Sequence, residues 1–134
     1  MAKADDVLTL RYPWIWAGLG WALVICVVVG SLLPGPMMPK ISVSDKFEHA
    51  GAYFLLMIWF SGLYRRNAHP IIGVVLLLLG IALDMLQGTT KTRTFDLHDI
   101  AADAVGILIG LVLAFWLLEG WCQRLERRLA APWA

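Results

Sequence analysis

Hydrophobic residues are gathered into four long runs, and short polar segments separate the runs. The runs cover about residues 14–33, 45–64, 70–87 and 96–118. Each is close to the roughly 20 residues that a helix needs to cross a bilayer. Neither a strand pattern nor an internal repeat is evident. The pattern predicts an all-α membrane protein with four transmembrane helices in an antiparallel bundle.

Residues at the ends of the runs support this division. Tyr12, Trp14 and Trp16 stand at the start of the first run, and aromatic side chains of this kind anchor helices at the membrane–water interface. Pro70 falls in the first turn of the third run, where its missing N–H is tolerated. Segment 34–39 contains three prolines, which cannot continue a helix, so we expect a stiff extended loop there.

Composition agrees with a single membrane domain over residues 1–134. The chain is 60% hydrophobic and 16% charged, whereas soluble domains carry about 25% charged residues. The basic residues form no stripe, so no nucleic-acid partner is expected. Asp5 and Asp6 precede a first run that is longer than a signal-peptide core, so we expect a permanent span. Cys26 and Cys122 have no metal or disulfide spacing and are expected to be packing residues.

Basic residues beside the runs predict the orientation, because cytoplasmic loops carry an excess of Lys and Arg. Seven lie in the N-terminal segment, the loop after the second run and the C-terminal tail, and four lie in the other two loops. Both termini are therefore expected in the cytoplasm, with loops 34–46 and 88–98 outside. Residues 119–134 are expected to form a basic cytoplasmic tail, with an interfacial helix over residues 123–128 that anchors on the anionic leaflet.

One face of the fourth helix consists of small residues. Ala102, Gly106, Gly110 and Ala114 recur every four residues, and this spacing lets helix backbones approach closely in lipid. We expect the fourth helix to be central to the bundle. The face of Gly106 and Gly110 is also a candidate contact for a homo-oligomer.

Acids and histidines gather at three helix ends, which an alternating topology brings to one side of the membrane. Together with neighbouring basic and amide residues, the polar set comprises Asp45, Lys46, Glu48 and His49 at the start of the second helix, Asp84 and Gln87 at the end of the third, and Asp96, His98, Asp99 and Asp103 at the start of the fourth. Lys91 and Arg93 come just before the fourth helix. A carboxylate within a span is costly and persists when it is paired, hydrated or useful. The cluster predicts a polar site at the outer mouth of the bundle.

Helical spacing predicts which of these side chains point into the bundle. His49 lies four residues from both Asp45 and Tyr53, on one stripe of the second helix. Asp99 and Asp103 share the small-residue face of the fourth. A histidine exchanges protons near neutral pH, and carboxylates orient it or act as bases. The candidate catalytic residues are therefore His49, Asp45, Asp84, Asp99 and Asp103, and the candidate ligand-binding residues are Lys46, Tyr53, Gln87, Lys91 and Arg93.

A divalent cation held by several of these oxygens remains open. The residues match no recognised metal spacing, so neither a metal site nor a cofactor is assigned.

Several of the polar residues also have a structural interpretation. Asp45, Glu48 and Asp96 suit helix N-termini, where acids favour the positive end of the helix dipole. His98 is either a cap or a bridge. His69, beside Pro70, is expected on the cytoplasmic surface.

Two acids lie inside apolar runs and are harder to explain as caps. An ion pair with Arg93 is the structural alternative for Asp84. A hydrogen-bonded lock between helices is the alternative for Asp103.

At these residues the sequence resembles the VanZ-like family of small bacterial membrane proteins. The resemblance covers about residues 30–115. Its motifs are Leu32-Leu33-Pro34, Asp45-Lys46-x-x-His49-x-x-x-Tyr53, Asp84-x-x-Gln87, and Arg93 followed by Asp99-x-x-x-Asp103-x-x-Gly106 and Gly110. The chain departs from the family pattern at Asp84, where glutamate is commoner, and at Asp103, where asparagine is usual.

The resemblance implies an integral protein of the bacterial inner (cytoplasmic) membrane. Founding members of the family are linked to resistance against the glycopeptide teicoplanin, and the family has no settled reaction. We therefore expect a site that binds or acts on envelope lipids or lipid-like, glycopeptide-related compounds, with membrane lipids as neighbours. Whether the protein is an enzyme is left open. The alternatives are an accessory protein whose polar cluster is a structural interhelical lock, and a proton-coupled transporter that works as an oligomer.

Overall fold

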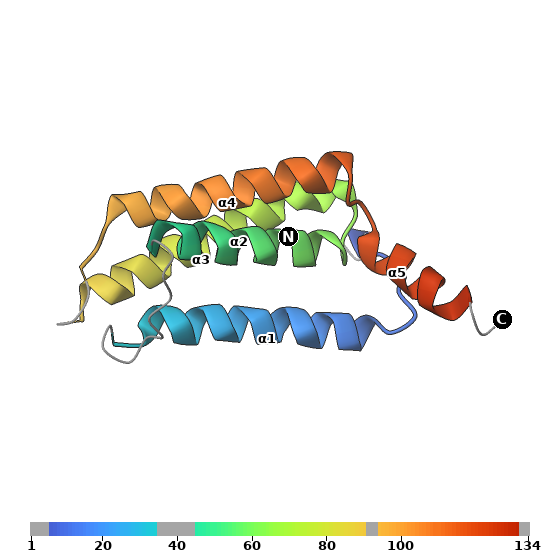
Figure 1. The fold of residues 1–134 in the computed structure, drawn as a ribbon, viewed down its shortest axis with the longest axis horizontal. Helices are drawn as coiled ribbons and strands as arrows, with labels where there is room; N and C mark the ends of the chain where they lie inside the picture. The colour runs from blue at the N-terminus through green and yellow to red at the C-terminus, as the bar shows by residue number, and fades with distance from the viewer. Residues whose placement is uncertain (1–5, 35–44, 91–93, 132–134) are drawn as a thin grey trace.

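The computed structural model describes residues 6–34, 45–90 and 94–131 of the chain, and helices dominate these ranges (Figure 1). The only β feature among them is an isolated bridge between Val7 and Tyr64. The helices are α1 (Pro13–Leu32), α2 (Asp45–Ser61), the short 3-10 helix η3 (Arg66–Ala68), α3 (His69–Gly88), α4 (Leu97–Trp116) and α5 (Trp121–Ala130). The predicted all-α class is confirmed.

Within the described ranges, three helical segments are long and apolar enough to cross a membrane: Pro13–Leu32, Arg66–Gly88 and Leu97–Trp116. The second predicted span is shorter than expected, because α2 ends at Ser61 and has 17 residues. At 1.5 Å per residue it is about 26 Å long, slightly less than the roughly 30 Å hydrocarbon core. Its first turn also carries Asp45 and Glu48.

Helices α2 and α4 form the closest contact of the bundle, and glycine makes this approach possible. A Cβ at Gly106 would overlap the carbonyl oxygen of Ala50, and a Cβ at Gly110 would lie 2.9 Å from Cβ of Met57. The close packing expected of this face of the fourth helix is confirmed, but the expected central position is not: α4 packs against α2 and α3, whereas α2 and α3 each contact all the other long helices. Within the chain, α2 covers this face at Gly106 and Gly110, and a contact with a second copy stays a prediction.

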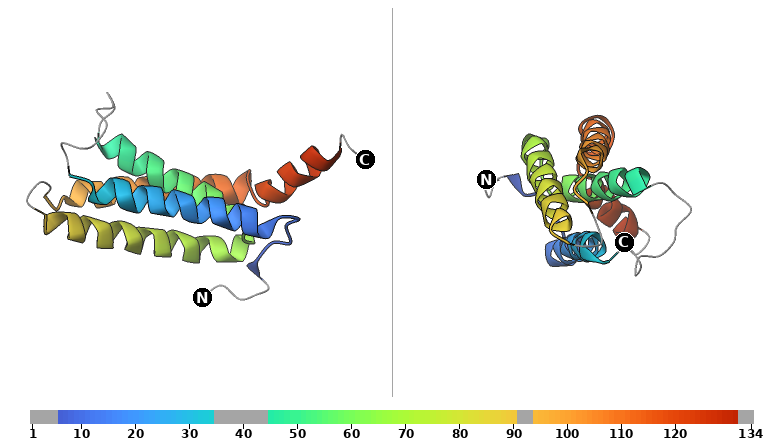
Figure 2. Two further views of the ribbon diagram at one scale, coloured as in Figure 1. Left: turned by 90° about the horizontal axis from the view of Figure 1, so that it is seen from below. Right: turned by 90° about the vertical axis from the view of Figure 1, so that its left-hand side faces the viewer.

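The apolar core comes from α2, α3 and α4, and α1 is attached to it more loosely. Tyr53, Leu56 and Met57 of α2 are buried together with Leu76 and Ile107. In α1 only Gly20 is buried. Figure 1 and the two views of Figure 2 show α1 running alongside the other three long helices. An apolar helix with so little buried surface needs lipid or a ligand against its remaining faces.

The end of the bundle opposite the polar cluster is closed by the N-terminal segment and α5. The Leu8 amide donates to the Leu63 carbonyl at 2.9 Å, and the Arg65 amide donates to the Asp6 carbonyl at 2.7 Å. Figure 1 shows α5 extending from this end of the bundle. The predicted helix in the tail is present, and it also contacts the rest of the protein.

Glu126 makes that contact. Its carboxylate accepts hydrogen bonds from the Arg11 amide at 2.7 Å, the Tyr12 amide at 3.0 Å and the indole N–H of Trp16 at 2.8 Å. The Trp16 ring also packs against Trp59 and Trp121. Aromatic stacking and the carboxylate together fasten α5 to the start of α1.

The expected surface position of His69 is wrong. The side chain is fully buried, and its Nε2 lies 3.2 Å from the Ser61 carbonyl and 3.1 Å from the Tyr64 carbonyl. Ser61 is the last residue of α2, and carbonyls at a helix C-terminus lack partners within the helix. His69 supplies that partner from the next helix, which a single-residue pattern does not show.

Candidate functional site

The outermost layer of the polar cluster is an ion pair network between α2 and α4. Lys46 donates from Nζ to Oδ2 of Asp96 at 2.8 Å and to Oδ1 of Asp99 at 2.6 Å. Lys46 was predicted to bind a ligand, and in the structure it binds these two acids.

Asp96 caps α4, as its structural interpretation predicted. Its side chain accepts a hydrogen bond from the backbone N–H of His98 at 2.8 Å. The hydrogen bonds from Lys46 and from this amide hold the pKa of Asp96 well below its usual value. The His98 ring is exposed and also contacts Asp96, so it serves the cap.

The next layer is the pair formed by His49 and Asp103. Nδ1 of His49 lies 2.9 Å from Oδ1 of Asp103, and Nε2 lies 3.8 Å from Oδ2 of Asp99. Asp103 thus orients the imidazole in the way that carboxylates orient catalytic or metal-binding histidines.

Helix α3 supplies the third side of the cluster. Asp84 and Gln87 are both about 2% exposed, and Gln87 donates to the Ser31 carbonyl of α1 at 2.7 Å. Gly80 lies one turn before Asp84. A Cβ at Gly80 would lie 2.6 Å from Oδ2 of Asp103, so a glycine here lets α3 approach the buried acid.

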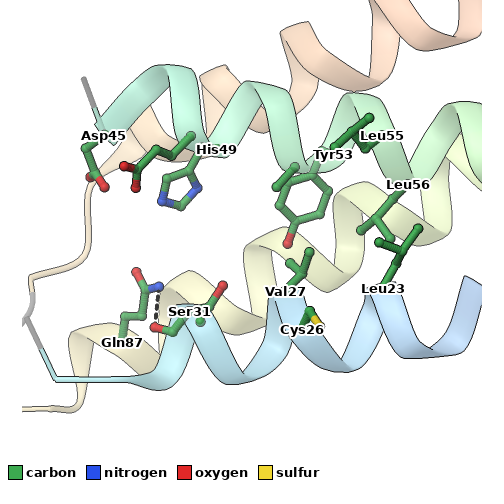
Figure 3. Close-up of a pocket in the computed structure, with 13 residues that line it drawn as sticks. Leu23, Cys26, Val27, Ser31, Asp45, His49, Tyr53, Leu55, Leu56 and Gln87 are labelled. Carbon is green, nitrogen blue, oxygen red and sulfur yellow. Dashed lines mark hydrogen bonds between the residues drawn. The ribbon is translucent and has the colours of Figure 1, made fainter. Parts of the chain in front are cut away.

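A cavity of about 290 Å³ opens beside this cluster, between α1 and α2 (Figure 3). Figure 3 shows Asp45 and His49 on α2 facing Gln87 and Ser31 across the polar end. The far end is apolar. The lining residues are Leu23, Cys26, Val27, Gly30, Ser31, Asp45, Glu48, His49, Ala52, Tyr53, Leu55, Leu56 and Gln87.

The structure brings most of the predicted site residues together. His49, Asp84 and Asp103 each offer a ligand atom within 4.8 Å of the others, and so do Asp45, His49 and Asp99. Tyr53 lies in both the core and the cavity wall. Two predicted ligand-binding residues, Lys91 and Arg93, and with them the proposed ion pair of Arg93 with Asp84, lie outside the described residues.

The α1 wall of the cavity was not predicted from the sequence. Cys26, Gly30 and Ser31 contribute to it. In a helix that is apolar on all faces, periodicity does not reveal which face borders a cavity. Glu48, interpreted from sequence as a cap or part of the polar cluster, also lines the cavity.

Comparisons with known proteins reveal one distant relative. No protein-family model matches the chain, and no solved structure matches it. The chain is 30% identical over 95 residues to an uncharacterised protein of the fission yeast Schizosaccharomyces pombe. The match covers 68% of this chain and 58% of the relative, so the chain spans less than two thirds of the relative's length. The fold defines a helical protein whose described residues include three helices long and apolar enough to cross a membrane.

Proposed function

We propose that the protein is an integral membrane protein that binds a single-chain amphiphile between α1 and α2. The observation that carries this proposal is the cavity, which is apolar over most of its length and polar at one end. This division matches a molecule with a hydrocarbon chain and a polar headgroup. Following the resemblance to the VanZ-like family, we place the protein in the bacterial inner membrane, with envelope lipids or glycopeptide-related compounds as ligands.

In this proposal α2 is a fourth span and both termini are cytoplasmic. Helix α2 lies along α1, α3 and α4 in the bundle (Figures 1 and 2). If these three cross the membrane, α2 crosses with them. Its short length is compensated by its first turn, because Asp45 and Lys46 can lie in the headgroup layer, where charge is tolerated.

The size of the cavity limits the ligand. Pockets for drug-sized ligands have volumes of about 300–1,000 Å³, and this cavity, at about 290 Å³, is at the lower limit. It suits one hydrocarbon chain beside Leu23, Val27 and Leu56, with the rest of the ligand in the surrounding lipid.

Charge at the polar end favours an amine-bearing headgroup. Asp45 lies there (Figure 3), Glu48 also lines the cavity, and none of the 13 described lining residues is Lys or Arg. His49 is placed to accept or donate a proton at the headgroup, with Asp103 behind it. A reaction on the headgroup would use this pair as general acid or base.

Two glycines of α1 provide a matched test of the cavity. Gly30 lines the cavity and Gly18 does not, and a Cβ at either position would meet no atom within 4 Å. Gly30→Leu should therefore fill part of the cavity, whereas Gly18→Leu should add the same side chain elsewhere on the same helix. We expect Gly30→Leu to weaken amphiphile binding by about tenfold, equal to about 1.4 kcal/mol, and Gly18→Leu to leave it unchanged.

The measurement is photo-cross-linking in phosphatidylcholine nanodiscs with a long-chain amine that carries a diazirine on its chain. Mapped peptides should carry the label between residues 23 and 31 and between residues 45 and 56. A long-chain sulfate with the same diazirine should label these peptides less. Equal labelling of the two leucine variants, or stronger labelling by the sulfate, would overturn the proposal.

The second candidate is an accessory protein in which the polar cluster is a structural lock. It is favoured by the contacts of Lys46 with Asp96 and Asp99 and of His49 with Asp103, since all of them join α2 to α4. A lock without a ligand site predicts no specific cross-link in the cavity and no difference between the two leucine variants.

A further inference from the structure

Three helices contribute one side chain each to a buried group behind the polar end of the cavity. His49 comes from α2, Asp84 from α3 and Asp103 from α4, and one ligand atom of each lies within 4.8 Å of the other two. His49 also lines the cavity, whereas the two acids do not. The group therefore lies between the cavity and the centre of the bundle.

One oxygen in this group has no partner. Asp103 is fully buried, and while its Oδ1 contacts His49, its Oδ2 makes no hydrogen bond to any of the described residues. A buried polar atom without a partner is costly. Its presence indicates a partner other than the described residues of the chain.

The unpartnered oxygen faces α3. A Cβ at Gly80 would lie 2.6 Å from Oδ2 of Asp103 and 3.3 Å from the hydroxyl oxygen of Tyr53. Gly80 and Asp84 are four residues apart and share one face of α3. Oδ2 of Asp103 therefore points to the same face of α3 that carries the second buried carboxyl group.

We propose that His49, Asp84 and Asp103 bind a divalent transition-metal ion, with Zn²⁺ as the ion that suits them best. The ion would supply the missing partner of the buried Oδ2 of Asp103 and would offset the cost of burying its charge. One imidazole nitrogen and two carboxylate oxygens suit zinc, whereas calcium takes six to eight oxygen ligands, about twice what this group offers.

The arrangement requires only a small contraction to reach metal-binding geometry. Bonds of about 2.1 Å in a tetrahedral site place the ligand atoms roughly 3.4 Å apart, and the ligand atoms here all lie within 4.8 Å of one another. Three protein ligands leave a fourth position open, as in catalytic zinc sites.

The neighbouring group of Asp45, His49 and Asp99 is a weaker candidate. Lys46 already binds Asp99 at 2.6 Å and would repel a metal ion. Asp45 is exposed, and solvent competes with a metal for exposed carboxylates.

The metal site does not depend on the amphiphile, so the two proposals can fail separately. The test uses the full chain purified in detergent, treated with a chelator and titrated with Zn²⁺ by calorimetry. The wild-type protein should bind one ion per chain. Asp103→Asn and Asp84→Asn should each weaken binding by more than about tenfold, since loss of even an outer partner costs about 10–100-fold.

Asp96→Asn is the matched control. It removes an acid at the same end of the bundle, and asparagine retains the capping of α4, so Zn²⁺ binding should equal that of the wild type. Replacing Zn²⁺ by Co²⁺ should produce visible absorption bands that Asp103→Asn removes. Absence of Zn²⁺ binding by the wild type, or unchanged binding by Asp84→Asn, would overturn the proposal. Loss on Asp45→Asn or Asp99→Asn, with Asp103→Asn unaffected, would assign the ion to the neighbouring group instead.

Discussion

His49 makes different contacts through its two ring nitrogens, and this gives it a central place in the protein. Nδ1 contacts the buried Asp103 and Nε2 points toward Asp99, while the ring borders the cavity. The imidazole therefore links the cavity wall to the buried acids.

The sequence allowed His49, Asp99 and Asp103 to be placed near one another, because charged residues at helix ends are conspicuous among apolar runs. It did not reveal which acid each base contacts. Lys46 was expected to bind a ligand, yet it binds Asp96 and Asp99. Pairing depends on distances of a few ångströms between helices, and residue spacing within one helix does not define those distances.

Gly106 provides a test of the close approach between α2 and α4. A Cβ there would overlap the carbonyl of Ala50, whereas a Cβ at the exposed Gly51 would meet no atom within 4 Å. We expect Gly106→Ala to lower the free energy of unfolding by about 1–3 kcal/mol, the usual cost of overpacking. Gly51→Ala should be neutral or stabilising by up to about 1 kcal/mol, because alanine favours a helix more than glycine.

Thermal or SDS-induced unfolding in detergent measures both alanine variants. Equal stability of the two would show that the backbones of α2 and α4 are not in contact at Gly106.

At the scale of elements, α5 is more than a basic anchor. Partial burial opposes ionisation of Glu126, but hydrogen bonds from the Arg11 amide, the Trp16 indole and the Tyr12 amide outweigh it, so the pKa of Glu126 is lowered from its ordinary value. The sequence predicted a basic interfacial helix here. It did not predict the contact, because Glu126 and Arg11 are 115 residues apart.

The lowered pKa of Glu126 predicts how the contact depends on pH. The folded state favours the carboxylate, so the contact is fully present above the ordinary glutamate pKa of 4.5 and is lost as the pH falls through the lowered pKa. Hydrogen exchange of residues 8–16 should therefore show protection at pH 7 that decreases at acidic pH, after correction for intrinsic rates.

Glu126→Gln should lower the protection factors of residues 8–16 by about fivefold already at pH 7, as expected for the loss of a contact worth about 1 kcal/mol. Glu119→Gln is the control, because Glu119 pairs with Arg66 instead. Unchanged protection in Glu126→Gln would show that the carboxylate does not hold the N-terminal segment.

For the molecule as a whole, the proposed topology places the two ends of α3 on opposite sides of the membrane. Asn67 and Thr90 are exposed at these two ends. In a background with Cys26 and Cys122 replaced by alanine, Thr90→Cys should react with a membrane-impermeant maleimide on intact cells. Asn67→Cys should react only after permeabilisation.

The reverse labelling pattern would invert the orientation. Labelling of both positions from one side would show that α3 does not cross the membrane. Cys26 is removed because it is exposed and would react with the maleimide. Cys122 is buried, and burial raises the pKa of its thiol to about 12, so it is expected to be unreactive while α5 stays in place. It is removed to exclude labelling if α5 detaches.

The sequence by itself determined the helical class, the approximate helices and the ends at which charge is concentrated, because these follow from hydrophobicity and spacing along one chain. The glycine face of α4 likewise identified its contact surface, since only small residues allow such an approach. Tertiary structure alone decided the partner of each acid, the burial of His69, the contact made by Glu126 and the cavity beside α1. Each of these depends on how separate helices are positioned against one another.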